Sequence, residues 1–195
     1  MKKNKPKYKQ IIDAAVMVIA ENGYHHAQVS KIAKRAGVAD GTIYLYFKNK
    51  EDILISIFEE KMGLFIEKIN GEIAGKSTAI EKLTTLVEMH FKHFSGEQHW
   101  AVVTQLELRQ SNQELRKKIN EILREYLDLI DLIIIEGKQN QEFKPELDVR
   151  LARQMVFGTI DEIVTSWVMK GQKFNITANS SIVAHMLVNG LSADG

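Results

Sequence analysis

Apolar residues recur along most of the chain at intervals of three and four positions, which is the period of an amphipathic α-helix. Near the N-terminus this face comprises Ile11, Ala15, Val18 and Ile19. No segment alternates apolar and polar residues in the manner of a half-buried strand, and the chain has no internal repeat. The pattern therefore predicts an all-α protein.

Residues with capping and turn chemistry divide this pattern into nine expected helices. Asn49, Thr78 and Asp148 have the side-chain acceptors that suit N-caps, and Gly137 is a residue type that ends helices. The expected helices cover about 11–22, 29–36, 40–47, 50–70, 79–96, 99–110, 113–136, 149–170 and 176–189.

The composition is that of a globular protein, with 195 residues, 45% of them apolar, and no Cys. The absence of Cys excludes a disulfide scaffold, a thiolate metal site and a cysteine nucleophile. No apolar run approaches the roughly 18 residues of a membrane span, and the basic stretch Met1–Lys7 precedes no apolar segment of a secretory signal. We therefore expect a cytoplasmic protein with no membrane partner.

Charge is distributed unevenly along the chain. Residues 1–50 contain ten Lys or Arg against three Asp or Glu, a net charge of +7, whereas residues 51–195 have a net charge of −6. A basic segment followed by an acidic remainder indicates a polyanion-binding module joined to a body with another role. The sequence thus predicts a DNA-binding domain at 1–50 and a second domain at 51–195.

Within the basic segment, two short expected helices flank a turn at Gly37, which is the pattern of a helix-turn-helix. Their small shared core comprises Ile32, Ala33, Val38 and Ile43. The second helix begins with the small residues Asp40, Gly41 and Thr42, so its N-terminus fits a major groove about 12 Å wide.

The run Gly37-Val38-x-x-Gly41-Thr42-Ile43-Tyr44-x-Tyr46-Phe47-x-x-Lys50 resembles the signature of the tetracycline-repressor (TetR) family. Residues 104–112 and 151–162 extend the resemblance over essentially the whole chain, to the TetR-type repressors of fatty-acid degradation that respond to acyl-CoA. The resemblance implies a homodimeric transcriptional repressor. It implies binding of double-stranded operator DNA by the N-terminal helices, and release when a long-chain fatty acyl-CoA occupies the C-terminal domain.

The family pattern assigns DNA-contacting roles residue by residue. Thr42, Tyr46 and Lys50 match its phosphate-contacting positions, whereas Asp40, Gly41 and Tyr44 match positions near the bases. The Ser or Thr caps that are usual in the family are replaced by Ala27-Gln28 and Ala39. We therefore expect Gln28 or Ser30 to cap one helix and Asp40 to cap the other.

Asp40 is unusual at the DNA-facing end of a helix because its carboxylate repels phosphate. Two explanations remain open at this point. The side chain either caps the helix and faces away from DNA, or it accepts a hydrogen bond from the N4 amine of cytosine in the major groove.

Arg109 follows Val102 and Leu106 at helical spacing, so its guanidinium is expected on an apolar stripe. Burying this charge is unfavourable unless it is paired. The partner is either an internal acid (Glu107, Asp161 or Glu162) or the anionic head of a ligand, which Arg binds bidentately. The resemblance favours the ligand, with Gln105, Gln110, Phe94 and Phe157 as further ligand-binding candidates.

The last two expected helices carry broad apolar faces. One face comprises Val156, Ile160, Ile163, Val164 and Trp167, and the other comprises Ile182, Val183, Met186 and Leu187. Because a single protomer offers few other apolar faces to cover both, we expect these helices to form the homodimer interface.

Catalytic and metal sites are not indicated. His90 and His93 stand three positions apart on an expected helix, without a third metal ligand nearby. There is no nucleophile–base pair and no glycine-rich phosphate loop, so we expect no enzyme activity, no metal and no cofactor beyond the effector. The alternatives are a TetR-type regulator of multidrug efflux that responds to lipophilic drugs, and an acyl-CoA carrier or small hydrolase with a basic tail.

Overall fold

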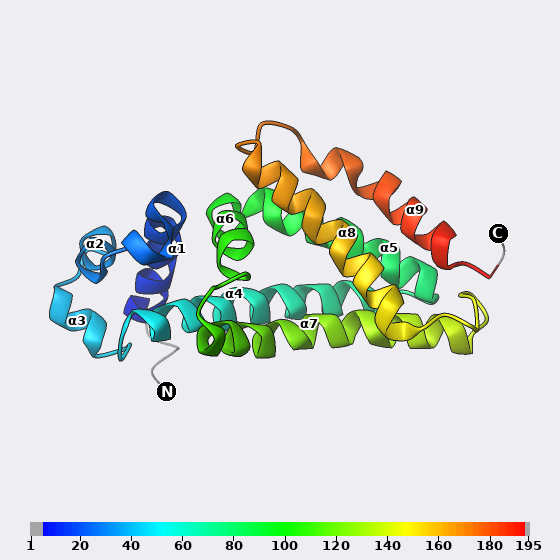
Figure 1. Ribbon diagram of the computed structural model, residues 1–195, viewed down its shortest axis with the longest axis horizontal. Helices are drawn as coiled ribbons and strands as arrows, with labels where there is room; N and C mark the ends of the chain where they lie inside the picture. The colour runs from blue at the N-terminus through cyan, green and yellow to red at the C-terminus, as the bar shows by residue number, and fades with distance from the viewer. Residues whose placement is uncertain (1–5, 194–195) are drawn as a thin grey trace. The chain divides into compact units, whose positions relative to one another are not determined.

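The computed structural model describes residues 6–193, and over this range it contains helices, one isolated bridge between Phe143 and Ser192, and no strand (Figure 1). The beginning of the basic stretch Met1–Lys7 lies outside the described residues. The helices are α1 (Pro6–His26), α2 (Val29–Arg35), α3 (Asp40–Tyr44), α4 (Lys50–Ile73), α5 (Ala79–Gly96), α6 (Gln98–Glu107), α7 (Gln113–Gln139), α8 (Val149–Met169), the 3-10 helix η1 (Ile176–Asn179) and α9 (Ser180–Leu191). The all-α prediction is confirmed, and none of these helices is both long and apolar enough to cross a bilayer.

Three predicted helix caps are confirmed. The Asp52 N–H donates to Asn49 Oδ1 at 2.8 Å at the start of α4, and the Leu151 N–H donates to Asp148 Oδ1 at 2.7 Å at the start of α8. Thr78 forms a complete capping box with Glu81 at the start of α5. Each cap supplies an acceptor to a backbone N–H that has no partner within its helix.

Several expected helix ends differ from the structure. Gly137 does not end α7, which continues to Gln139. The ring of Phe143 lies where a side chain at this position would be, since a Cβ on Gly137 would meet it at 2.2 Å. Glycine is therefore required here for close packing. At the other end of the chain the expected end of the first helix at residue 22 is confirmed, because Gly23 is non-helical with φ of 72° and ψ of 155°, and the residues from Tyr24 to His26 form a further turn that α1 includes.

The chain divides into two compact units. The first comprises residues up to Gly63 together with His99–Ile122, so it contains α1, α2, α3, α6 from its second residue onward, and the first parts of α4 and α7. Its core includes Ile11, Ile32 and Ile43 among the N-terminal helices. It also includes Phe58 of α4 and Trp100 of α6, whose ring centroids are 5.0 Å apart.

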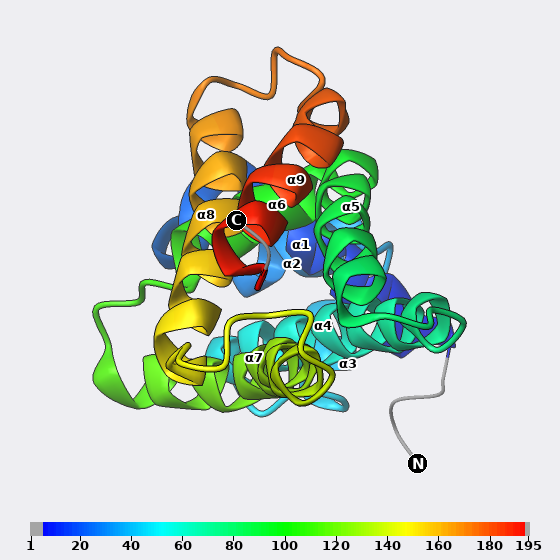
Figure 2. The same ribbon diagram turned by 90° about the vertical axis from the view of Figure 1, so that its right-hand side faces the viewer.

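The second unit comprises Leu64–Gln98 and the residues from Leu123 onward. Within it α9 lies side by side with α5 and with α8 (Figure 2). Phe91, Val156 and Ile160 are fully buried in its core. Both units combine segments that are distant in sequence, so they are not divided at a single point of the chain. The predicted division between residues 50 and 51 stays a prediction.

Candidate functional site

The helix-turn-helix is present in the first unit. Gly37 has a φ of 64° directly after α2, a left-handed conformation that glycine adopts without steric cost and that turns the chain toward α3. Ile32 and Ile43 are fully buried and join the two helices. The outer surface of α3 is consequently left free to meet a partner.

The predicted DNA-contacting residues lie on α2, on α3 and at the start of α4, except that Gln28 is the N-cap before α2 and Tyr46 lies between α3 and α4; all are within the first unit. Those that are exposed are Gln28, Ser30, Asp40, Gly41 and Tyr44, whereas Thr42, Tyr46 and Lys50 are half-buried. Tyr44 is 58% exposed despite its large ring, which a DNA-contacting role would explain and a core role would not.

The expected side-chain caps of α2 and α3 are wrong. Gln28 and Ala39 occupy the two N-cap positions, and neither makes a side-chain cap hydrogen bond. Asp40 is the first residue inside α3 and is exposed, with no hydrogen bond to its carboxylate from any residue in the 6–193 range. Since Ala39 takes the N-cap position, Asp40 is not the cap of this helix.

Lys50 has a structural partner that its sequence position does not reveal. Its Nζ donates to the backbone carbonyl oxygens of Tyr24 at 2.9 Å and His25 at 3.0 Å, and lies 4.6 Å from the ring centroid of Tyr24. The ammonium therefore caps the carbonyl end of α1 from the first residue of α4.

A buried carboxylate joins the end of α6 to the same part of α1. Glu107 is 5% exposed and accepts a hydrogen bond from the Tyr24 N–H at 3.1 Å and another from Gln110 Nε2. Burial raises the pKa of Glu107. Burial, with the nearby charges of Glu51 and Glu107, also raises the pKa of Tyr24 to about 12.

The expectation that Arg109 lies on a buried apolar stripe is wrong. Helix α6 ends at Glu107, and its buried side chains are Trp100, Ala101, Val103, Thr104, Gln105 and Glu107. Arg109 follows this helix and is exposed, as is Leu106. Its Nη1 lies 3.4 Å from both the backbone oxygen and the side-chain oxygen of Gln105.

The predicted ligand-binding residues fall in both units. Gln105, Arg109 and Gln110 belong to the first, where Gln105 and Gln110 are buried, whereas Phe94 and Phe157 belong to the second. That these five residues bind one ligand stays a prediction.

An aromatic cluster occupies part of the second unit. It comprises Phe65, His90, Phe94, Tyr126 and Phe157, with neighbouring ring centroids 4.9 to 6.2 Å apart. His90 Nδ1 lies 3.0 Å from the Tyr126 hydroxyl. Burial, with the charge of His93, lowers the pKa of His90 to about 3, so this imidazole is neutral at physiological pH. Residues 6–193 hold no group of three or more His, Cys, Asp or Glu that is arranged to bind a metal.

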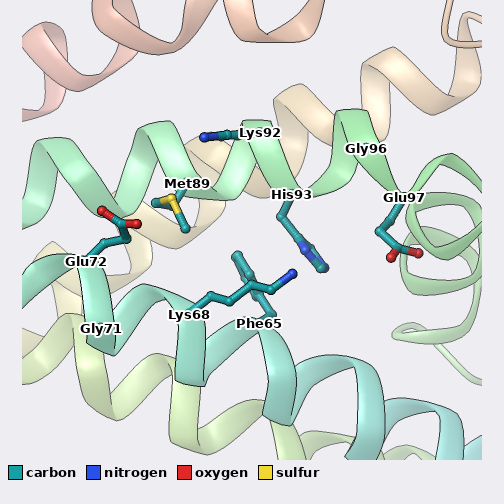
Figure 3. A pocket seen from close by; sticks show the side chains of 9 residues that line it. All are labelled: Phe65, Lys68, Gly71, Glu72, Met89, Lys92, His93, Gly96 and Glu97. Carbon is teal, nitrogen blue, oxygen red and sulfur yellow. The ribbon is translucent and has the colours of Figure 1, made fainter.

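A pocket of about 530 Å³ opens between α4 and α5 in the second unit, which we call the α4–α5 pocket (Figure 3). Its volume is within the range of roughly 300–1,000 Å³ that is usual for small-molecule sites. It is lined by Phe65, Lys68, Gly71, Glu72, Met89, Lys92, His93, Gly96 and Glu97.

The walls of this pocket combine apolar and charged groups. Phe65 and Lys68 of α4 point toward Met89 and His93 of α5 (Figure 3). The rings of Phe65 and His93 are stacked with centroids 4.3 Å apart. The sequence does not reveal this pocket, because Lys68 has the spacing of an ordinary solvated position and nothing local to α4 shows that α5 leaves a hollow beside it.

The predicted dimer faces require a correction. Val156, Ile160, Val164, Trp167, Val183 and Leu187 are buried within the protomer, so they are not available to a second copy. The exposed apolar residues of α8 and α9 are Leu151, Met155, Met169, Ile182 and Met186. Ile182 and Met186 belong to the predicted set and are 63% and 69% exposed.

The similarity to known proteins extends over nearly all of the chain. Residues 11–57 match the family of bacterial regulatory proteins called tetR, and residues 58–190 match the C-terminal region of YsiA-like proteins. The fatty acid metabolism regulator protein of Bacillus subtilis is 64% identical over 191 residues, which are 98% of each chain.

Two solved structures are similar in sequence as well as in fold. The transcriptional regulator FadR from Bacillus subtilis, in complex with stearoyl-CoA, has a TM-score of 0.91 and 65% identity, covering 94% of this chain and 99% of that one. The fatty acid degradation regulator FadR from Bacillus halodurans has a TM-score of 0.91 and 61% identity, with the same coverage. With the helix-turn-helix described above, these matches show that the chain belongs to the tetR family of bacterial regulatory proteins.

Proposed function

We propose that this protein is a transcriptional repressor of fatty-acid degradation genes, which binds operator DNA as a dimer and releases it when long-chain acyl-CoA binds. The observation that carries the proposal is 64% identity, over 98% of both chains, to a fatty acid metabolism regulator. A FadR of 65% identity was crystallised with stearoyl-CoA. The protein then acts in the cytoplasm, on DNA and a metabolite, and has no catalytic role.

DNA binding is assigned to the exposed side of the helix-turn-helix. The start of α3 enters the major groove, where Asp40, Gly41 and Tyr44 face base edges. Thr42 and Tyr46 contribute hydroxyl groups to phosphates. Exposed Gln28 and Ser30 at the start of α2 are assigned to the neighbouring backbone.

Lys50 fits a phosphate contact because of the way it is held. An ammonium group has three N–H donors. Two of them are directed to the carbonyl oxygens of Tyr24 and His25, which fixes the position of Nζ. The third donor remains for a phosphate oxygen, so the side chain loses little further freedom when DNA binds.

For the effector, the second unit offers both kinds of surface that acyl-CoA needs. The apolar chain requires adaptable apolar neighbours, which Met89 and the aromatic cluster provide. The phosphates of the CoA portion require cations, which Lys68 and Lys92 provide at the α4–α5 pocket. Phe94 and Phe157 are assigned to the acyl chain, and Arg109, with Gln105 and Gln110, is the other candidate for the head.

The dimer is assigned to the exposed apolar residues of α8 and α9. Apolar side chains exposed together are typical of a surface covered by a partner. A lysine at position 182 introduces a charge there, so Ile182→Lys should yield monomers in analytical ultracentrifugation at micromolar concentration. Leu64→Lys, which changes an exposed leucine on α4, should remain a dimer. A dimeric Ile182→Lys variant would show that the interface lies elsewhere.

One observation favours the efflux-regulator alternative. Glu72 and Glu97 also line the α4–α5 pocket, and carboxylates suit a lipophilic cation. The two functions therefore predict effectors of opposite charge.

The proposed function is tested by fluorescence anisotropy with DNA selected from a random-sequence pool by the wild-type protein. Stearoyl-CoA is expected to release this DNA, whereas free CoA and a lipophilic cation such as rhodamine 6G are not. Release by the cation alone would support the efflux regulator. Failure to select any DNA sequence would contradict both forms of the proposal.

A further inference from the structure

His90 is a polar side chain in an apolar environment. It is 3% exposed and is surrounded by the rings of Phe65, Phe91, Phe94 and Tyr126. The imidazole therefore has to satisfy its two nitrogens among groups that are mostly apolar.

One nitrogen of His90 has a partner and the other does not. Nδ1 lies 3.0 Å from the Tyr126 hydroxyl. Nε2 is buried and has no hydrogen-bond partner among the residues from 6 to 193. A buried polar atom in this condition requires an explanation, because proteins satisfy nearly all such atoms.

The pair with Tyr126 determines what the second nitrogen offers. A neutral imidazole has one N–H and one acceptor nitrogen. The phenol is the better donor of the pair and the imidazole nitrogen the better acceptor, so we assign the tautomer in which the Tyr126 O–H donates to Nδ1. The ring proton of His90 then resides on Nε2, which is a hydrogen-bond donor inside an aromatic core.

The fold gains nothing from this donor. The hydrogen bond to Tyr126 occupies Nδ1 alone, and a phenylalanine at this position would remove the unpartnered Nε2 while leaving the buried Tyr126 hydroxyl without its partner. The Nε2 donor itself is therefore not used by the fold among residues 6–193.

The α4–α5 pocket comes close to this donor. Phe65 lines the pocket, and its ring also contacts His90 edge to face with centroids 5.9 Å apart. His93, three positions further along α5, lines the same pocket and stacks on Phe65. Phe65 thus contacts His90 and also lines the pocket, so it is the side chain that links His90 to a pocket ligand.

We propose that His90 Nε2–H donates a hydrogen bond to the carbonyl oxygen of the acyl thioester, which makes His90 a specificity-determining residue for the effector. The inference rests on the proposed function, because it takes the effector to be an acyl-CoA. The carbonyl is the single polar group of the acyl portion, so its position at His90 fixes where the CoA portion ends and the apolar chain begins. The chain then lies along Phe94 and Phe157, and the phosphates are directed toward Lys68 and Lys92.

The test compares stearoyl-CoA with S-octadecyl-CoA, a thioether of equal chain length without the carbonyl oxygen. Both are titrated against wild-type protein on its selected DNA. The thioether leaves Nε2–H unsatisfied, so half-release is expected to need about 5- to 100-fold more of it. In His90→Phe the two ligands should act at equal concentration. The exposed histidine of α6 provides the control, since His99→Phe should discriminate as the wild type does.

Thermal melting of the variant separates a role in recognition from a role in folding. His90→Phe removes the unpartnered Nε2 but also leaves the buried Tyr126 hydroxyl without its partner, so the double variant His90→Phe/Tyr126→Phe is expected to melt at or above the temperature of His90→Phe. Equal release of the wild type by both ligands, or continued discrimination by His90→Phe, would overturn the assignment alone. Failure of both ligands to release the wild type would overturn the proposed function and the assignment with it.

Discussion

Lys50 Nζ donates a hydrogen bond to the backbone carbonyl oxygen of Tyr24 at 2.9 Å, and Tyr24 in turn donates its N–H to Glu107 at 3.1 Å. One residue at the end of α1 thus contacts both the start of α4 and the end of α6. Hydrogen bonds as well as apolar packing therefore hold α1 against the start of α4 and the end of α6.

Replacement of Lys50 by alanine is predicted to weaken binding to all DNA sequences alike. Loss of one phosphate contact should reduce the slope of log K against log salt by about one. The melting temperature should also fall, because two carbonyl groups of α1 lose their donor. Anisotropy titrations over a range of salt concentrations measure the slope.

The matched control is Lys118→Ala, which removes an exposed charge of α7 away from the helix-turn-helix sequence. Its salt slope should equal that of the wild type. An unchanged slope in Lys50→Ala, with a lower melting temperature, would mean that Lys50 serves the fold alone.

Asp40→Ala is predicted to relax the preference at a single base pair. If the carboxylate accepts from the N4 amine of cytosine, its removal costs about 1–3 kcal/mol for the correct base and leaves the other positions unchanged. Because Asp40 neither caps α3 nor accepts a hydrogen bond from residues 6–193, the melting temperature should be preserved. A binding profile across operator variants that matches the wild type would exclude base recognition by this side chain.

Glu107 gives a pH dependence whose sign follows from its burial. A folded-state pKa above the unfolded value means that the folded protein retains this proton more tightly. The stability it contributes is complete below the unfolded pKa and is lost as pH rises through the folded pKa. In Glu107→Gln this loss should vanish, so the free energy of unfolding of the variant should rise relative to the wild type as the pH increases above the unfolded carboxyl pKa of about 4.

Chemical denaturation of both proteins at each pH measures this difference. Groups that both proteins share cancel, including Glu81, whose pKa is lowered by hydrogen bonds from the N–H groups of Ser77 and Thr78. A difference in free energy of unfolding that is constant with pH would show that Glu107 has the same pKa in the folded and unfolded states.

The two candidate sites for the CoA head predict different variants with a weakened response. If Arg109 binds the head, Arg109→Ala should retain operator binding but need several-fold more stearoyl-CoA for release. If the head lies at the α4–α5 pocket, Lys68→Ala and Lys92→Ala should show that increase and Arg109→Ala should not. An unaltered response in all three variants would place the head at neither site.

The sequence was sufficient for features that depend on local chemistry. Helical periodicity predicted the elements, and the cap residues Asn49, Thr78 and Asp148 were found because a cap acts within one turn of its own helix. The helix-turn-helix was found because its core and its glycine turn lie within a short contiguous segment.

Features that depend on distant segments were missed or misread. Gly137 was interpreted as a helix end because its neighbour Phe143 returns to it through a turn that the sequence does not specify. Periodicity placed Arg109 on the apolar face of a helix that ends two residues earlier. Glu107 accepts from Tyr24, 83 positions away, and His90 contacts Tyr126, 36 positions away, so these two contacts were not visible in any local pattern.

The central claim is that binding of acyl-CoA lowers the affinity of this protein for operator DNA. It is tested most directly by measuring how each ligand changes the affinity for the other. Isothermal titration gives the affinity for stearoyl-CoA with and without saturating operator DNA, and anisotropy gives the affinity for DNA with and without stearoyl-CoA. Because coupling between two sites is reciprocal, both affinities should fall by the same factor, which we expect to be at least about tenfold. Affinities that are unchanged in both directions would contradict the claim.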